Sequence, residues 1–117
     1  MTDLFLPKLM SRCLHHNTLG CIALCPGRCC LHLYFGNVGL RLLPHKLRQW
    51  RGMVAELCTF HTAHVVDAEA RSLSLPGPTS DQVFLFSLEE MFLLHDLLIS
   101  ASLLLEVDTI LAQAASQ

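Results

Sequence analysis

The sequence predicts a mainly α fold, a small helical domain with a long C-terminal helix and one β-hairpin at residues 31–42. Residues 88–114 contain no proline or glycine, apolar residues recur at helical spacing over residues 44–66, and apolar positions alternate on both sides of Gly36-Asn37. The chain of 117 residues is 52% hydrophobic and 15% charged. It is long enough for one hydrophobic core and has little polar surface to cover it, so we expect an exposed apolar patch.

The C-terminal helix is the longest predicted element. Leu, Met, Ala and Glu dominate residues 88–114, and Ser87 with Glu90 fits the spacing of a capping box. Thr79 with Gln82 fits the same spacing upstream, which leaves residues 83–86 open to helix or to a short extended stretch. At 1.5 Å per residue this helix would be ~40 Å long. Its apolar residues lie nearly all the way round, so it should be central in the fold or in an oligomer.

The N-terminal half is predicted to combine helices with the hairpin. Pro44 suits the first position of a helix over residues 44–66, and Pro7 limits residues 2–16 to a short helix. The apolar stripe of the 44–66 helix comprises Leu47, Trp50, Val54, Leu57, His61, His64 and Ala68. In the hairpin, Gly36 suits a type II′ turn. The resulting register pairs Phe35 with Val38, Leu33 with Leu40 and Leu31 with Leu42, all on one face.

The organisation that we expect is a single small domain over residues 1–117. Residues 1–71 form a basic half rich in Cys and His, residues 72–80 read as a linker around Pro76-Gly77-Pro78, and residues 81–117 form an acidic, Leu-rich helical segment. The net charge is +5 over residues 1–58 and −7 over residues 59–117. Attraction between the two halves within one fold explains this asymmetry more simply than a nucleic-acid or membrane arm does.

The six cysteines raise the question of compartment. The N-terminus lacks the basic start and apolar run of a signal peptide, so we expect reduced thiols and a cytoplasmic or nuclear protein. Residues 97–105 form the longest uncharged run near the C-terminus, well short of the ~20 residues that a transmembrane helix needs. Membrane association through a tail anchor stays an alternative, because several leucines could offset the cost of burying Asp96.

Two groups of Cys and His residues could bind zinc. Cys21, Cys25, Cys29 and Cys30 lie within ten residues, with His15, His16 and His32 nearby, but this spacing differs from that of the usual closed zinc sites. The simpler interpretation is that these cysteines are small core residues, and lipidation is a third.

The second group is Cys58, His61 and His64, which lie three residues apart and could converge on one helix face. They could hold a catalytic zinc, with Asp67 orienting a histidine, or form a Cys–His nucleophile pair. The simpler interpretation is a helix face that becomes polar near its end.

Other functional classes find little support. Arg41, Lys46, Arg48 and Arg51 lie near Trp50, but four cations are few for a nucleic-acid site, and Trp50 falls on the apolar stripe. Phosphate-binding loops, dinucleotide-binding fingerprints and nucleophile elbows are absent from the sequence. We therefore predict neither an enzyme nor a nucleic-acid-binding protein.

The leading functional hypothesis is a non-catalytic protein that binds a partner, or its own copy, through the Leu-rich C-terminal helix. The residues predicted to make this contact are Phe92, Leu93, Leu97, Leu98, Leu104 and Leu105. The first alternative is the product of an open reading frame with little selected function, because local signals occur without a consistent global pattern. The second is a small zinc-binding protein that uses the Cys and His groups. No other cofactor is predicted.

Overall fold

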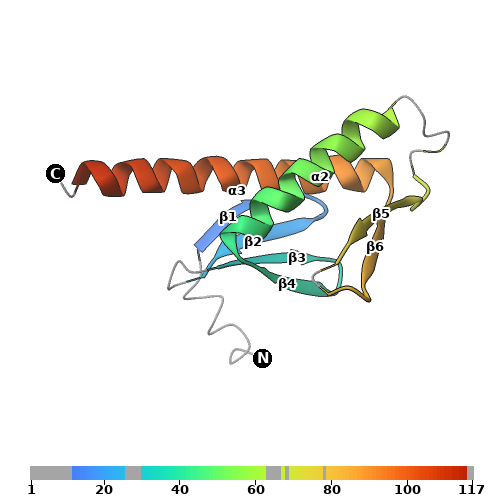
Figure 1. Cartoon of the computed structure of the whole chain (residues 1–117), viewed down its shortest axis with the longest axis horizontal. Coiled ribbons are helices and arrows are strands. Elements are labelled where there is room, and N and C mark those ends of the chain that lie inside the picture. The colour runs from blue at the N-terminus through green and yellow to red at the C-terminus, as the bar shows by residue number, and fades with distance from the viewer. Residues whose placement is uncertain (1–11, 26–29, 63–66, 68, 78, 116–117) are drawn as a thin grey trace.

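A four-stranded antiparallel sheet, a two-stranded sheet and two helices share one hydrophobic core (Figure 1). The structure is a computed structural model that describes residues 12–25, 30–62, 67, 69–77 and 79–115, with the backbone alone at residues 61 and 62. In these ranges the elements are β1 (Arg12–His16), β2 (Gly20–Leu24), β3 (Leu31–Phe35), β4 (Val38–Leu42), α2 (Pro44–Thr62), β5 (Leu73–Pro76), β6 (Val83–Phe86) and α3 (Leu88–Ala115). The fold is mixed α/β, and the prediction of a mainly α fold is wrong.

The β3–β4 hairpin confirms the sequence prediction in its register. Phe35 pairs with Val38, Leu33 with Leu40 and Leu31 with Leu42. Gly36 has a φ of +57°, the left-handed conformation that a primed hairpin turn requires at its first position. The strands formed where expected because turn chemistry and the alternation of apolar residues agree.

The missed strands account for the error in fold class. Residues 12–16, expected in a short helix, form β1, which pairs with β2. The register of this pair shifts by one residue between Cys13 and His15. The predicted linker at residues 72–80 contains β5, which pairs with β6. Strand β6 covers residues 83–86, the stretch left open between helix and extended structure. Gln82 donates its backbone N–H to Thr79 in the turn before β6, so that pair forms no helix cap.

Both long helices begin at the positions that the sequence predicts from Pro44 and from the Ser87–Glu90 capping box. Helix α2 begins at Pro44, and the last four residues of its predicted range, 63–66, lie outside the described residues. Helix α3 begins at Leu88 after a complete capping box. The backbone N–H of Glu90 donates to Ser87 Oγ at 3.0 Å, and that of Ser87 donates to Glu90 Oε1 at 2.9 Å.

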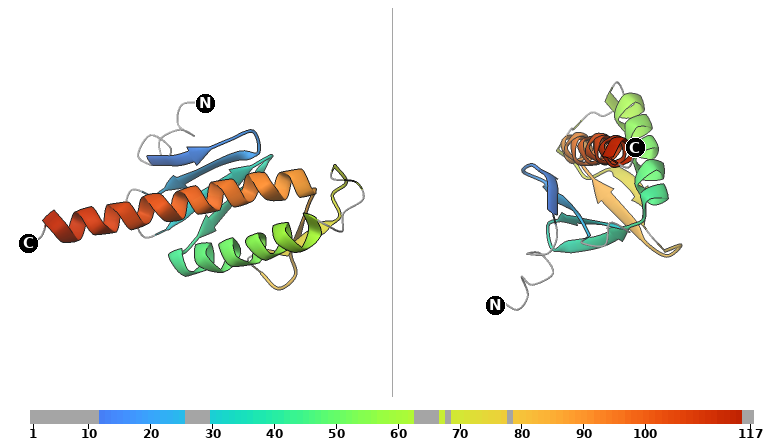
Figure 2. Two further views of the ribbon diagram at one scale, coloured as in Figure 1. Left: turned by 90° about the horizontal axis from the view of Figure 1, so that it is seen from above. Right: turned by 90° about the vertical axis from the view of Figure 1, so that its left-hand side faces the viewer.

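The core lies between the four-stranded sheet and the two helices, which cover the same face of that sheet (Figure 2). The first half of α3 crosses this layer and contributes its buried residues, while its C-terminal part projects beyond the sheet (Figure 1). The fully buried large side chains are Ile22, Leu31, Leu33, Leu42, Leu47, Val54, Leu75, Met91, Leu94, Leu97 and Leu98.

Candidate functional site

The C-terminal half of α3 carries the main exposed apolar surface of the described chain. Leu103 is 57% exposed, Val107 50% and Ile110 62%, at spacings of four and three residues. Ala114 continues this spacing, and Leu104 and Leu111 flank it. We call Leu103, Val107, Ile110 and Ala114 the α3 stripe. Residues at this spacing lie along one side of a helix, so the stripe presents a continuous apolar edge to solvent.

The predicted partner-binding residues are divided between this surface and the core. Phe92 and Leu104 are exposed, and Leu93 and Leu105 are half-buried. Leu97 and Leu98 are fully buried among the chain's own side chains, so a partner cannot reach them in the folded protein. The sequence could not separate the two sets, because α3 is apolar on all sides.

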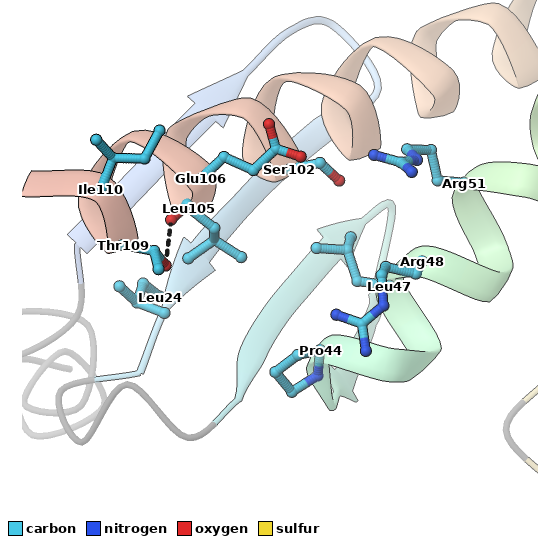
Figure 3. A pocket seen from close by; sticks show the side chains of 10 residues that line it. All are labelled: Leu24, Pro44, Leu47, Arg48, Arg51, Ser102, Leu105, Glu106, Thr109 and Ile110. Atoms are coloured by element: carbon cyan, nitrogen blue, oxygen red, sulfur yellow. Dashed lines mark hydrogen bonds between the residues drawn. The ribbon is translucent and has the colours of Figure 1, made fainter. Parts of the chain in front are cut away.

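A groove of about 530 Å³ lies beside the stripe, between the N-terminal turns of α2 and the C-terminal half of α3 (Figure 3). Leu24, Leu47 and Leu105 line its apolar wall. Arg48 and Arg51 line it from α2, and Glu106 from α3. The groove is therefore an apolar slot with a partly basic margin.

The hydroxyl groups in this groove are already bonded to their own helix. Ser102 Oγ donates to the carbonyl oxygen of Leu98 at 2.9 Å. Thr109 Oγ1 donates to the carbonyl oxygen of Leu105, also at 2.9 Å (Figure 3). Among the described residues, no buried side-chain nitrogen or oxygen lacks a hydrogen-bond partner. The hydroxyl groups of Ser102 and Thr109 are therefore paired within α3, beside the apolar wall of the groove.

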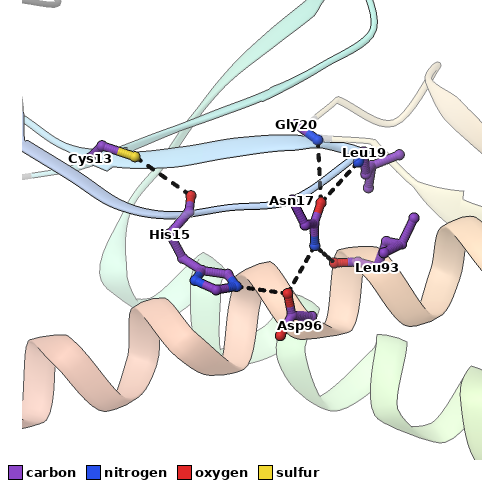
Figure 4. A network of polar contacts seen from close by, with 7 residues as sticks. All are labelled: Cys13, His15, Asn17, Leu19, Gly20, Leu93 and Asp96. Carbon is purple, nitrogen blue, oxygen red and sulfur yellow. Dashed lines mark hydrogen bonds and ion pairs between the residues drawn. The ribbon is translucent and has the colours of Figure 1, made fainter.

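A polar network fixes the direction of α3 against the β1–β2 hairpin (Figure 4). Asn17 Nδ2 donates to the carbonyl oxygen of Leu93 and to Asp96 Oδ2, both at 2.9 Å, while Asn17 Oδ1 accepts the backbone N–H of Leu19. His15 Nε2 lies 2.7 Å from Asp96 Oδ2. The hydrogen bond from Asn17, followed by that from His15, holds the pKa of Asp96 below its usual value.

A second link to β1 lies further along α3. Arg12 on β1 forms an ion pair with Asp108 at 2.7 Å. Together with the Asn17–Asp96 network, it aligns α3 with the first strand. The helix therefore leaves the body of the protein in a defined direction.

The first group of predicted metal ligands is partly assembled. Cys25 and Cys30 come together with His32, and their ligand atoms all lie within 4.8 Å of one another. Cys21 lies four residues before Cys25 on the same hairpin, which corresponds to about 13 Å along a strand. Cys29 lies outside the described residues. The sequence places His32 near the four cysteines without assigning it as a ligand. The register of the β2–β3 pair brings it beside Cys25 and Cys30.

The second group is not assembled by the described side chains. Cys58 is buried in the core on α2, and burial raises the pKa of its thiol, which disfavours the thiolate that a metal or a nucleophilic reaction needs. His64 lies outside the described residues, as does the side chain of His61. Trp50 is also in the core, so it cannot stack on a base beside Arg48 and Arg51.

Comparisons with known proteins leave this geometry as the basis for any functional argument. No family model, no curated protein and no solved structure matches the chain. Among the described residues, α3 is the one helix long and apolar enough to cross a membrane, a test that the core helix of a soluble protein also passes.

Proposed function

We propose that this chain is a non-catalytic interaction protein that forms a dimer with a second copy of itself through the α3 stripe. The exposure of Leu103, Val107 and Ile110 on a projecting helix supports the proposal. Removing apolar surface from water is favourable by about 25 cal/mol per Å². Large apolar side chains gathered on one exposed helix edge are typical of an interface.

The spacing of the stripe favours another helix as the occupant. Leu103, Val107, Ile110 and Ala114 follow the 4-3-4 pattern of a coiled-coil seam, in which side chains of one helix fit between those of a second. Ala114 is small and would allow the two helices to approach closely near the end of α3. A flat or strand-like partner would not match this period.

The charges at the end of α3 are compatible with a second copy of this chain as the occupant. The last turn of α3 has no basic residue, and its terminal carbonyl groups carry partial negative charge. In an antiparallel pair, the end of each α3 would lie near the Arg48 and Arg51 margin of the partner's groove. A two-fold axis makes this contact twice, which is the arrangement of an isologous dimer.

Length and charge argue against a membrane as the occupant. The exposed part of α3, residues 103–115, is about 20 Å long, whereas the hydrocarbon core of a bilayer is about 30 Å thick. Spanning would require Leu97 and Leu98 to leave the protein core. Glu106 and Asp108 also disfavour binding to anionic lipid headgroups.

Sedimentation equilibrium of Val107→Glu tests the proposal. A charge at this position would face the partner in both copies, so we expect the dimer dissociation constant to rise at least about 100-fold, given about 1.5–3 kcal/mol for each buried apolar side chain. The matched control is Gln113→Glu, which adds the same charge at an exposed position outside the stripe. In the proposed dimer this position lies near the basic margin of the partner's groove, so the control should not weaken the dimer.

Three results would contradict self-association through the stripe. They are a wild-type chain that stays monomeric at high concentration, a Val107→Glu dimer as tight as the wild type, and equal weakening by Gln113→Glu. Flotation of the wild type with neutral phosphatidylcholine vesicles, abolished by Val107→Glu, would assign the stripe to lipid instead.

A further inference from the structure

Three metal-ligating side chains meet at the end of the β2–β3 hairpin where the chain passes from β2 to β3. Cys25 directly follows β2, Cys30 directly precedes β3, and the backbone N–H of Cys25 donates to the carbonyl oxygen of Cys30 at 3.0 Å. This bond continues the β2–β3 ladder, so the two cysteines lie opposite each other. His32 follows Cys30 by two residues and shares its face of the strand. Buried Ile22 and Leu31 occupy the other face, toward the helices, so the three ligands lie on the side of the sheet away from α2 and α3.

The distances between the ligand atoms fit one tetrahedral ion. Bond lengths of about 2.3 Å to sulfur and 2.0–2.1 Å to nitrogen place a sulfur and a nitrogen about 3.6 Å apart and two sulfurs about 3.8 Å apart. Cys30 Sγ and His32 Nε2 are 3.9 Å apart, and the three ligand atoms all lie within 4.8 Å. Closing the site around an ion thus requires shifts of about 1 Å or less, within the reach of small side-chain rotations.

We infer that Cys25, Cys30 and His32 form a binding site for Zn²⁺. Two thiolates and one imidazole are ligands that zinc prefers, and three protein ligands leave one tetrahedral position for water or an external group. This inference is independent of the α3 dimer, because the ligands lie on the opposite side of the sheet. It extends the function of the chain from docking to metal binding.

Neighbouring side chains support the geometry of the site. His32 stacks on Tyr34 with an interplanar angle of 12° and a centroid distance of 6.1 Å, which restricts the orientation of the imidazole. Arg41 pairs with His32 across the β3–β4 ladder, so its positive charge lies on the same face. Two thiolates and one Zn²⁺ are neutral together, and formation of the complex from two thiols would release two protons.

Two of the other described cysteines provide matched controls. Cys21 is opposite Tyr34 on the same sheet face but about 13 Å along the strand from Cys25. Cys13 is exposed on β1, where it pairs with Ala23. Both residues carry a thiol, but neither belongs to the group of three ligand atoms that lie close together. Substituting them therefore distinguishes binding at the proposed site from unspecific binding of zinc to thiols.

The test is titration of the full, metal-free chain with Zn²⁺ under reducing conditions, followed by competition with a chelator. We expect one ion per chain, release of two protons on binding, and thiolate-to-metal absorption when Co²⁺ replaces zinc. Cys25→Ser, Cys30→Ser and His32→Gln should each weaken binding at least about 100-fold, beyond the loss typical of groups that only orient a ligand. Cys13→Ser and Cys21→Ser should leave the affinity unchanged.

Circular dichroism separates loss of ligation from loss of folding. Cys30 is buried, so its substitution can disturb the sheet, whereas Cys25 and His32 are half-buried and keep the test decisive. Lack of stoichiometric zinc in the folded wild type would overturn the inference. Full affinity in folded Cys25→Ser or His32→Gln would also overturn it, as would equal weakening by Cys21→Ser. Val107→Glu should bind zinc normally, which keeps this result separate from the dimer test.

Discussion

Gly20 and Gly52 show how the surroundings of one residue decide the effect of an identical substitution. A β-carbon at Gly20 would collide with the backbone carbonyl of Tyr34 on the neighbouring strand. Backbone atoms in a paired ladder cannot yield as the end of a flexible side chain can. A β-carbon at Gly52, on the exposed side of α2, would meet nothing within 4 Å.

We therefore expect opposite signs for the two alanine substitutions. Gly20→Ala should lower the free energy of unfolding by about 3 kcal/mol or more, because β2 and β3 would have to separate. Gly52→Ala should raise it by about 0.5–1 kcal/mol, because alanine loses less backbone entropy in a helix. Urea denaturation of both variants measures the difference. A neutral Gly20→Ala would contradict the close approach of the two strands.

The first turn of α3 combines a helix cap with an ion pair to the segment before β5. Glu90 accepts the backbone N–H of Ser87 and receives two hydrogen bonds from Arg71, at 3.0 and 2.9 Å. The guanidinium of Arg71 is the main cause that holds the pKa of Glu90 below its ordinary value of 4.5. The charged form of Glu90 is therefore stabilised in the folded state.

The stability that Glu90 contributes should depend on pH. Because its pKa is lower in the folded chain, the contribution is fully present above pH 4.5 and is lost as the pH falls through the folded pKa. Glu90→Gln keeps an acceptor for Ser87 but removes the charge that faces Arg71. We expect it to destabilise the protein at pH 7, and the difference from wild type to vanish in acid. Chemical denaturation across this pH range measures it, and a pH-independent difference would exclude the ion pair as its cause.

Elements with two agreeing local signals could be predicted from the sequence, and elements with one could not. The hairpin at residues 31–42 has both a Gly36-Asn37 turn and clear alternation. Strand β2 lacks alternation, because Cys21 and Ala23, on the face away from Ile22, are themselves apolar. Strand β5 alternates, but the Pro-Gly-Pro signal that begins at its last residue, Pro76, favoured a linker. Pairing with β6 stabilises it as a strand, and that contact is not local in sequence.

The candidate sites were predictable to the extent that they depend on one element. That α3 carries exposed apolar residues could be predicted from its composition, but which side is exposed depends on how α2 and the sheet cover it. Leu97 and Val107 are equally apolar, yet one is in the core and the other in solvent. Likewise, Cys25 and Cys30 were grouped by proximity in sequence. That His32, rather than Cys21, joins these two cysteines as a ligand depends on the register of the strands, which the sequence did not reveal.

At the scale of the molecule, α3 connects the parts of the fold. Its first half packs against α2 and both sheets through Met91, Leu94 and Leu97, and its second half leaves the body as an apolar projection. One helix thus supplies the centre of the core and the proposed dimer contact. Residues 59–117 are acidic and residues 1–58 basic, and the Arg12–Asp108 pair is a direct contact between them.

This arrangement predicts a single cooperative unfolding transition, in which α3 and the four-stranded sheet are lost together. A chain with little selected structure would unfold gradually, because its contacts would not support one another. Leu97→Ala should cost about 2–5 kcal/mol, since it leaves a cavity where α3 meets the core. Leu111→Ala, on the exposed part of the same helix, should change the stability of the monomer by no more than about 0.5 kcal/mol. Thermal and urea unfolding followed by circular dichroism and Trp50 fluorescence measure both. Non-coincident transitions, or equal effects of the two substitutions, would contradict a core organised around α3 and favour an open reading frame product without a selected fold.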